Sequence, residues 1–309
     1  MHLRLLLAAS LLGLASCATA PAGAPAKAKA SYRSAKDIID AAPASAWRDL
    51  DPDNTLYLEL PAGRVVIELA PGFAPEHIAN IKALAQGGFW DGLSIYRAQD
   101  NFVVQFGDPD AGSAGARPYP SGARAHLPAE FNRGDKGVRF DKLPDRDGYA
   151  PEAGFAGGFP AGHDPKTGQL WLAHCYGLLG AGRDTPPDSS TGAELYIVIG
   201  QAPRALDRQL SAVGRVVKGM ELLSAIPRGP EPMGFYEHAG QRTQILSIRL
   251  ASSLPEAQRT PLQLLRTDSQ AFIDATEARR NRVDDFYSIP AGYIDLCSVP
   301  LPVRAPPKP

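Results

Sequence analysis

The stretch SIYRAQDNFVVQFGD, residues 94–108, decides the fold of this 309-residue chain. Its apolar side chains alternate with polar ones on both sides of Asp100-Asn101, a pair that suits a tight turn. Alternation on either side of a turn predicts two β-strands. These strands carry the polar side chains of Arg97 and Gln105.

The segments before this stretch predict a hairpin followed by a helix. Residues 55–70, TLYLELPAGRVVIELA, alternate in hydropathy on both sides of a Pro-Ala-Gly turn. In residues 73–88, apolar side chains recur at helical spacing between Pro75 at the start and Gly87 just past the end. The chain therefore begins its folded part with β structure and one helix.

Several short strands and a second helix are predicted downstream. The helix is expected over residues 218–226, where Met220, Leu223 and Ile226 have helical spacing. Strand-like runs cover residues 170–182, 193–200, 210–217 and 243–251. Many short strands with two helices favour an all-β protein, a closed antiparallel β-barrel capped by two helices, over a parallel α/β fold.

Composition supports this class and excludes others. Lys and Arg number 32 against 33 Asp and Glu, so no basic excess exists to bind nucleic acid. With 44% hydrophobic residues the chain is too apolar to be disordered, and its 30 Gly and 29 Pro indicate many turns. The six histidines are scattered without a metal-ligand pair at helical spacing, and we expect neither a metal nor a cofactor.

The N-terminus has the layout of a secretory signal. Residues 1–17, MHLRLLLAASLLGLASC, place one arginine before an apolar run that is too short to span a membrane. The last four of them, Leu-Ala-Ser-Cys, resemble the lipobox of bacterial lipoproteins, in which Cys17 would carry the lipid; the alternative is an ordinary cleaved signal that contains a cysteine. Without Asp at position 18, the resemblance implies a periplasmic protein anchored to the outer membrane of a Gram-negative bacterium. In that oxidising compartment Cys175 and Cys297 could pair, although a buried free thiol is an equal alternative for Cys175.

Changes in composition predict the domain plan. Residues 18–46 contain an Ala/Pro/Lys tract with little to bury and are expected to form a flexible tether. The barrel is expected over residues 47–251, interrupted by a Gly/Pro-rich insertion at about 109–168 that has few apolar runs. Residues 252–309 form an appendage with one helix, near 269–282, and a proline-rich end.

Residues 94–108 resemble the signature of the cyclophilin-type peptidyl-prolyl isomerases, in which an aromatic-His-Arg step and a turn precede Phe-Met and a Gln-Gly-Gly-Asp ending. The matching positions, without a gap, are Arg97, Phe102, Gln105, Gly107 and Asp108. Further segments resemble the family in the same order along the chain, from about Leu56 to Leu250. They are Pro75 to Ile81 in the first helix, Trp90 to Gly92, Ala129 to Asn132, Gly177 to Asp184, Ser190 to Gly200 and Leu206 to Ile226.

The resemblance implies rotation about Xaa-Pro peptide bonds in proline-containing polypeptides, by a monomer that meets the membrane only through its lipid. Arg97 would donate to the prolyl nitrogen, and Gln105 would fix the substrate backbone. The resemblance implies a proline pocket formed by Phe102, Val103, Leu195 and Leu210, with Glu194 adding a negative charge beside the groove.

Several pocket positions differ from the family, which leaves two functions open. Val103 replaces the common Met, Glu194-Leu195-Tyr196 replaces Gln-Phe-Phe, and Ala205 and Leu210 replace the Trp and the His. One function is an isomerase that assists the folding of exported proteins. The alternative is a catalytically weak cyclophilin-like module that binds proline-containing peptides as a scaffold. Retention of Arg97 favours the enzyme, because a pure binder needs no donor aimed at the prolyl nitrogen.

Overall fold

The computed structural model describes residues 32–307, and the account below concerns the compact unit that begins at Arg33. The expected signal sequence, with Cys17, lies outside the described residues, as does most of the expected tether. Within the described part of the chain, no helix has both the length and the hydropathy needed to cross a membrane.

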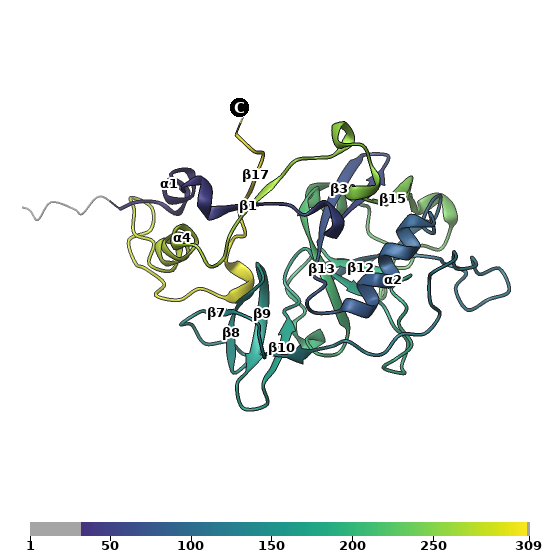
Figure 1. The fold of residues 1–309 in the computed structure, drawn as a ribbon, viewed down its shortest axis with the longest axis horizontal. Helices are drawn as coiled ribbons and strands as arrows, with labels where there is room; N and C mark the ends of the chain where they lie inside the picture. The colour runs from purple at the N-terminus through teal and green to yellow at the C-terminus, as the bar shows by residue number, and fades with distance from the viewer. Residues whose placement is uncertain (1–31, 308–309) are drawn as a thin grey trace, which may run out of the picture. The chain divides into compact units, whose positions relative to one another are not determined.

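A nine-stranded antiparallel sheet forms the main body (Figure 1). Its strand order is β14-β4-β5-β12-β11-β13-β3-β2-β15, so the two hairpins expected from the sequence lie at opposite ends of the sheet. The strands are β2 (Thr55–Leu60), β3 (Gly63–Leu69), β4 (Ser94–Ala98), β5 (Val103–Gly107), β11 (Leu178–Ala181), β12 (Leu195–Val198), β13 (Ser211–Lys218), β14 (Thr243–Gln244) and β15 (Ser247–Leu250).

The sheet is curled but not closed, which corrects the expectation of a closed barrel. Its two edge strands, β14 and β15, are consecutive in the chain and do not pair with each other. Between them the chain bends at Ile245 and Leu246, whose amides donate to Leu93 O at 2.8 Å and to Glu59 O at 2.9 Å. One bent segment therefore serves both edges, and no ladder of hydrogen bonds joins them.

Two helices contribute to the core inside the sheet. Helix α2 (Pro75–Gln86) is the helix predicted from the sequence, and it buries Ile78, Ile81 and Leu84. Pro75 is tolerated in its first turn because the amide hydrogen that proline lacks would have no acceptor there. Helix α3 (Met220–Ser224) is shorter than predicted and adds Leu223 to the same core.

A second antiparallel sheet is formed by four strands of the insertion, where the sequence had indicated loop, and by β10, which extends the insertion to residue 172. Its order is β6-β10-β9-β8-β7, and in Figure 1 strands β7 to β10 lie side by side. Phe159, Leu170 and Leu172 of this sheet cluster with Leu178 and Tyr196, which belong to the large sheet. The strands are β6 (Arg133–Gly134), β7 (Phe140–Lys142), β8 (Glu152–Ala156), β9 (Phe159–Asp164) and β10 (Gln169–Leu172).

The two ends of the described chain meet in a third, smaller unit. Strand β1 (Trp47–Asp49) pairs with β16 (Gln263–Leu265), which pairs with β17 (Val303–Arg304). Helix α1 (Ala35–Asp40) contacts α4 (Gln270–Arg280). Part of the expected tether is thus helical, and the expected appendage shares its strands with the start of the body.

The C-terminal segment packs on the insertion, and a disulfide bond ties it to the segment that follows β10. Phe272 and Leu296 share a hydrophobic cluster with Phe155 of β8. Cys175 and Cys297 form a disulfide, which decides between the two alternatives left open by the sequence. Short 3₁₀ turns complete the chain at Ala44–Ala46, Pro52–Asn54, Arg204–Leu206, Ala239–Gln241, Ala251–Ser253, Glu256–Gln258 and Leu296–Ser298.

Candidate active site

A β-bulge in β4 turns two consecutive side chains to the outer face of the large sheet. Ile95 pairs with Phe106 and Arg97 with Gln105, so Tyr96 is the extra residue on β4. Ile95 points into the core, whereas Arg97 lies on the outer face beside Gln105, the residue opposite it on β5. Bulges commonly re-aim side chains in this way next to active sites.

Arg97 is held by three hydrogen bonds. Its Nη1 donates to Gln105 Oε1 at 3.0 Å, its Nε to Met233 O at 2.7 Å, and its Nη2 to the Gln99 side chain. The residue is only 9% exposed, and this burial lowers the pKa of its guanidinium, which nevertheless stays protonated at physiological pH. A guanidinium has five N–H groups, so these bonds leave two for a bound peptide.

Two aromatic rings, those of Phe102 and Phe235, lie close to this guanidinium. The Arg97 Cζ atom is 5.7 Å from the ring centroid of Phe102 and 4.9 Å from that of Phe235. Phe235 also stacks on Tyr96, with centroids 6.0 Å apart. Aromatic faces attract cations at these distances, so both rings favour the observed position of the guanidinium.

Phe235 belongs to a loop, residues 227–236, that sequence reasoning did not connect with the site. The loop runs beside β4, where Ala98 N donates to Gly234 O at 2.9 Å. Gly234 has a φ of +75°, and a Cβ there would lie 2.6 Å from Gln99 Cα, so only glycine allows this approach. The only signal in the sequence is an aromatic residue within a Pro/Gly-rich loop.

Glu194 ends a line of hydrogen bonds that begins at Arg97. Gln105 Nε2 donates to the Tyr96 hydroxyl at 2.7 Å, and this hydroxyl donates to Glu194 Oε2 at 2.6 Å. The other carboxyl oxygen accepts from Asp108 N at 2.7 Å. Burial raises the pKa of Glu194 to about 7. The negative charge expected beside the groove is therefore only partly present at neutral pH, and both oxygens already have partners within the protein.

Leu195 does not lie on the face expected for a pocket residue. It pairs with Phe106, is 1% exposed and belongs to the core inside the sheet. Successive side chains of a strand point to opposite faces, so the next residue, Tyr196, lies beside Gln105 on the outer face. Tyr196 therefore lies where Leu195 was predicted, on the outer face of the sheet. The prediction that Leu195 lines the proline pocket is wrong.

The other three expected pocket residues lie together. Phe102, Val103 and Leu210 share one apolar cluster with Tyr196 and with residues of the insertion. Val103 is only 2% exposed, whereas Phe102 and Leu210 are half-buried. The insertion therefore covers part of the apolar surface next to Arg97, and Phe102 is the half-buried ring of this cluster that lies within cation–π distance of the guanidinium.

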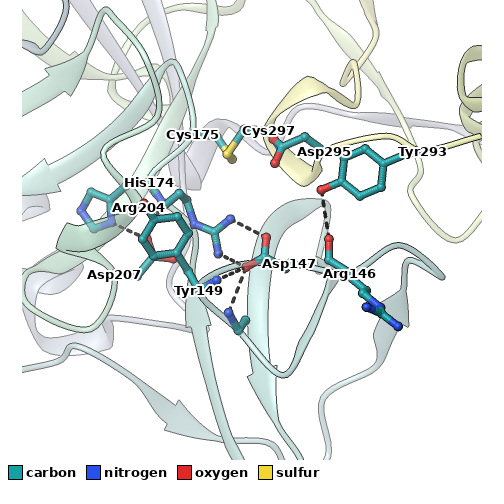
Figure 2. Close-up of polar contacts among 11 residues, drawn as sticks. Arg146, Asp147, Tyr149, His174, Cys175, Arg204, Asp207, Tyr293, Asp295 and Cys297 are labelled. Carbon is teal, nitrogen blue, oxygen red and sulfur yellow. Dashed lines mark hydrogen bonds and ion pairs between the residues drawn. A yellow bond between two sulfur atoms is a disulfide. The ribbon is translucent and has the colours of Figure 1, made fainter. Parts of the chain in front are cut away.

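Tyr196 is fixed by a buried polar chain. His174 Nε2 lies 2.8 Å from the Tyr196 hydroxyl, and His174 Nδ1 lies 3.0 Å from Asp207 Oδ1. Figure 2 shows how this chain continues through Arg204, which bonds to Asp207 and to Asp147 of the insertion. These contacts connect β12 with the insertion through side chains that are almost fully buried.

Residues 55–249 match the family described as "Cyclophilin type peptidyl-prolyl cis-trans isomerase/CLD". The chain belongs to this family. The matched residues contain the bulge, the Arg97–Gln105 pair, Glu194 and the 227–236 loop, so the candidate site lies within the cyclophilin domain.

Related proteins agree with this assignment. Probable peptidyl-prolyl cis-trans isomerases of Brucella suis biovar 1 and Brucella melitensis biotype 1 are each 29% identical over 187 residues, covering 59% of this chain and 75% of the relative. The crystal structure of cyclophilin AquaCyp293 from Hirschia baltica matches with a TM-score of 0.65 and 26% identity, covering 84% of this chain and 92% of that one. The similarity to this cyclophilin covers more of the chain than residues 55–249, and therefore includes segments outside the family domain.

In the part of the chain that the structure describes, no group of three or more His, Cys, Asp and Glu side chains is placed to hold a metal ion. The Arg97 guanidinium, which lies near Phe102, and the Gln105 amide bonded to it carry donors that suit the recognition of peptide backbone.

Proposed function

We propose that this cyclophilin isomerises Xaa-Pro bonds of exported polypeptides on the outer face of β4 and β5. The uncatalysed barrier is about 18–20 kcal/mol because the prolyl nitrogen lone pair is delocalised into the carbonyl. A donor that bonds to this nitrogen when the amide twists stabilises the transition state more than either planar isomer, and so raises the rate.

Arg97 is the donor in this proposal. Its three bonds to Gln105, Met233 and Gln99 hold it in one orientation before substrate binds, so little ordering is needed during the reaction. The observation that carries the proposal is its position 5.7 Å from the Phe102 ring. A proline ring packed on Phe102 would bring its nitrogen within reach of the free N–H groups of the guanidinium.

Gln105 has a positioning role. It accepts from Arg97 through Oε1 and donates to Tyr96 through Nε2, so its amide orientation is fixed at both ends. In this way Tyr96 and Glu194, which differ from the family pattern, hold the Gln105 amide in position beside Arg97. The family match does not favour the alternative of a binding module without turnover.

The experiment is exchange NMR on a short Ala-Pro peptide with catalytic amounts of protein. With wild-type protein, the cis and trans signals of the peptide should broaden or show exchange. Arg97→Ala should reduce the catalysed rate by about 10²-fold, as expected when one transition-state donor is lost. Arg139→Ala is the matched control, because Arg139 is 66% exposed and lies in the insertion. Wild-type exchange at the uncatalysed rate would refute the function, and undiminished exchange by Arg97→Ala would refute the site.

The cellular setting is part of the proposal. The signal-like residues 1–17 with their lipobox cysteine support a lipid-anchored periplasmic protein, and the Cys175–Cys297 disulfide is typical of an oxidising compartment. Cys17→Ser should move the protein from the membrane fraction to the soluble fraction. An unchanged distribution of the variant would contradict the anchor while leaving the isomerase assay unaffected.

A further inference from the structure

A cavity of about 230 Å³ lies apart from Arg97 and Gln105, where the large sheet, the insertion and the C-terminal segment meet. Phe159 and Leu172 come from the insertion, Leu178 and Arg215 from the large sheet, and Leu296 from the C-terminal segment. The Cys175–Cys297 disulfide forms part of the wall. Side chains from all these segments line the space.

Arg215 is the one charged side chain that lines this cavity. It is 8% exposed, and its Cζ atom lies 5.6 Å from the ring centroid of Phe159. Its Nε donates to Glu68 Oε2 at 3.2 Å. Among residues 32–307, its two Nη groups have no hydrogen-bond acceptor. The Nη atoms do not belong to the fully buried polar atoms that lack a partner in the described chain, so they are accessible and offer four N–H groups to a molecule in the cavity.

The local charge balance is positive. Glu68 is shared, because its other carboxyl oxygen accepts from Arg48. Two guanidinium groups therefore face one carboxylate, and one positive charge near the cavity is not neutralised. A second carboxylate would neutralise it and could accept from both Nη groups in the paired geometry that arginine favours.

The rest of the lining suits an apolar molecule. Besides Arg215, the cavity is lined by aliphatic, aromatic and sulfur-containing side chains and by backbone. A dry cavity of about 150 Å³ is known to hold benzene, so the larger volume here has room for a short alkyl chain or a ring. We propose that this cavity binds a small apolar molecule with one carboxylate, whose head group pairs with Arg215.

Octanoate and 1-octanol are matched probes, because they share a chain and differ in charge. By calorimetric titration at pH 7, wild type should bind octanoate more tightly than octanol. Arg215→Met should weaken octanoate binding by at least about tenfold, the loss expected for a charge-assisted hydrogen bond, and should leave octanol binding unchanged. Glu68 keeps Arg48 in this variant, which limits the cost to folding. Arg139→Met is the control, because the side chain of Arg139 is far more exposed than that of Arg215. This variant should bind both probes as tightly as wild type does.

A second variant keeps the test independent of Arg215. Leu301→Trp places bulk in the cavity from the C-terminal segment and should abolish binding of both probes while isomerase activity persists. Failure of wild type to bind octanoate at millimolar concentration would overturn the proposal. Equal octanoate affinity of wild type and Arg215→Met would overturn the role of the arginine, and wild-type binding by Leu301→Trp would place the ligand elsewhere.

Discussion

Replacing Glu194 by Gln should remove a pH dependence from the stability of the protein. The substitution keeps the shape of the side chain and its ability to bond to Tyr96 and Asp108, but it removes the titratable group. In the folded protein burial raises the pKa of Glu194 from 4.5 to about 7. The folded state therefore holds a proton on Glu194 between about pH 4.5 and pH 7 that the unfolded chain releases.

The sign and size follow from this difference. Because the folded state binds more protons in this range, the free energy of unfolding must fall as pH rises through it. Each pKa unit corresponds to about 1.4 kcal/mol. The rise in the pKa of Glu194 from 4.5 to about 7 therefore changes the free energy of unfolding by at most about 3 kcal/mol. The stability that Glu194 contributes is present below pH 4.5 and is lost above pH 7.

The assay is urea unfolding of both proteins from pH 5 to pH 8. Other titrating groups act equally on wild type and Glu194→Gln, so the difference between their unfolding free energies isolates Glu194. We expect this difference to shift in favour of the variant by 1 kcal/mol or more, up to about 3 kcal/mol, as pH rises. Curves that stay parallel across this range would refute the reasoning, because they would mean that Glu194 titrates alike in the folded and unfolded states.

Three further predictions concern the parts of the structure around the site. Mutating Cys175 and Cys297 together to Ala should lower the unfolding free energy by about 2–5 kcal/mol, since the disulfide closes a sequence separation of 122 residues; equal urea midpoints of oxidised wild type and the variant would contradict this. Gly180→Ala should cost about 1–3 kcal/mol and shift the Tyr196 ring signals in NMR spectra, because the new Cβ would lie 2.2 Å from Tyr196 Cζ; unshifted signals would show that the ring lies elsewhere. Deleting residues 252–309 should abolish cooperative thermal unfolding, because it removes the partners of β1 and of the insertion; a sharp transition in the truncated protein would show that they fold without it.

Local patterns were sufficient to predict much of the large sheet. Hydropathy alternation in residues 55–70 and 94–108 and the spacing in residues 73–88 correspond to β2, β3, β4, β5 and α2. These elements are regular, and their inner faces are apolar, so neighbours in sequence carry the signal. The family signature added the choice of Arg97 and Gln105 as site residues, which the bulge in β4 places side by side.

The remaining features depend on contacts between distant segments. Strands β6 to β10 are short and interrupted by glycines, so their alternation is weak, and β1 pairs with β16 only because the two ends of the body meet. Leu195 was assigned to the wrong face because alternation alone does not say which of two adjacent apolar residues points inward. Phe235 reaches Arg97 through a loop with no periodicity to read.

The bent segment that forms β14 and β15 has a consequence for how the chain folds. It pairs with β4 and with β2, the first strand of the large sheet, and it is the last part of that sheet to be made. The sheet therefore cannot be completed on the ribosome until almost the whole cyclophilin domain has emerged. Pairings between distant segments also form slowly, because a long loop must close first. Under the export proposed above, this delay would keep the nascent polypeptide extended, and able to cross the membrane, until its final strand is made.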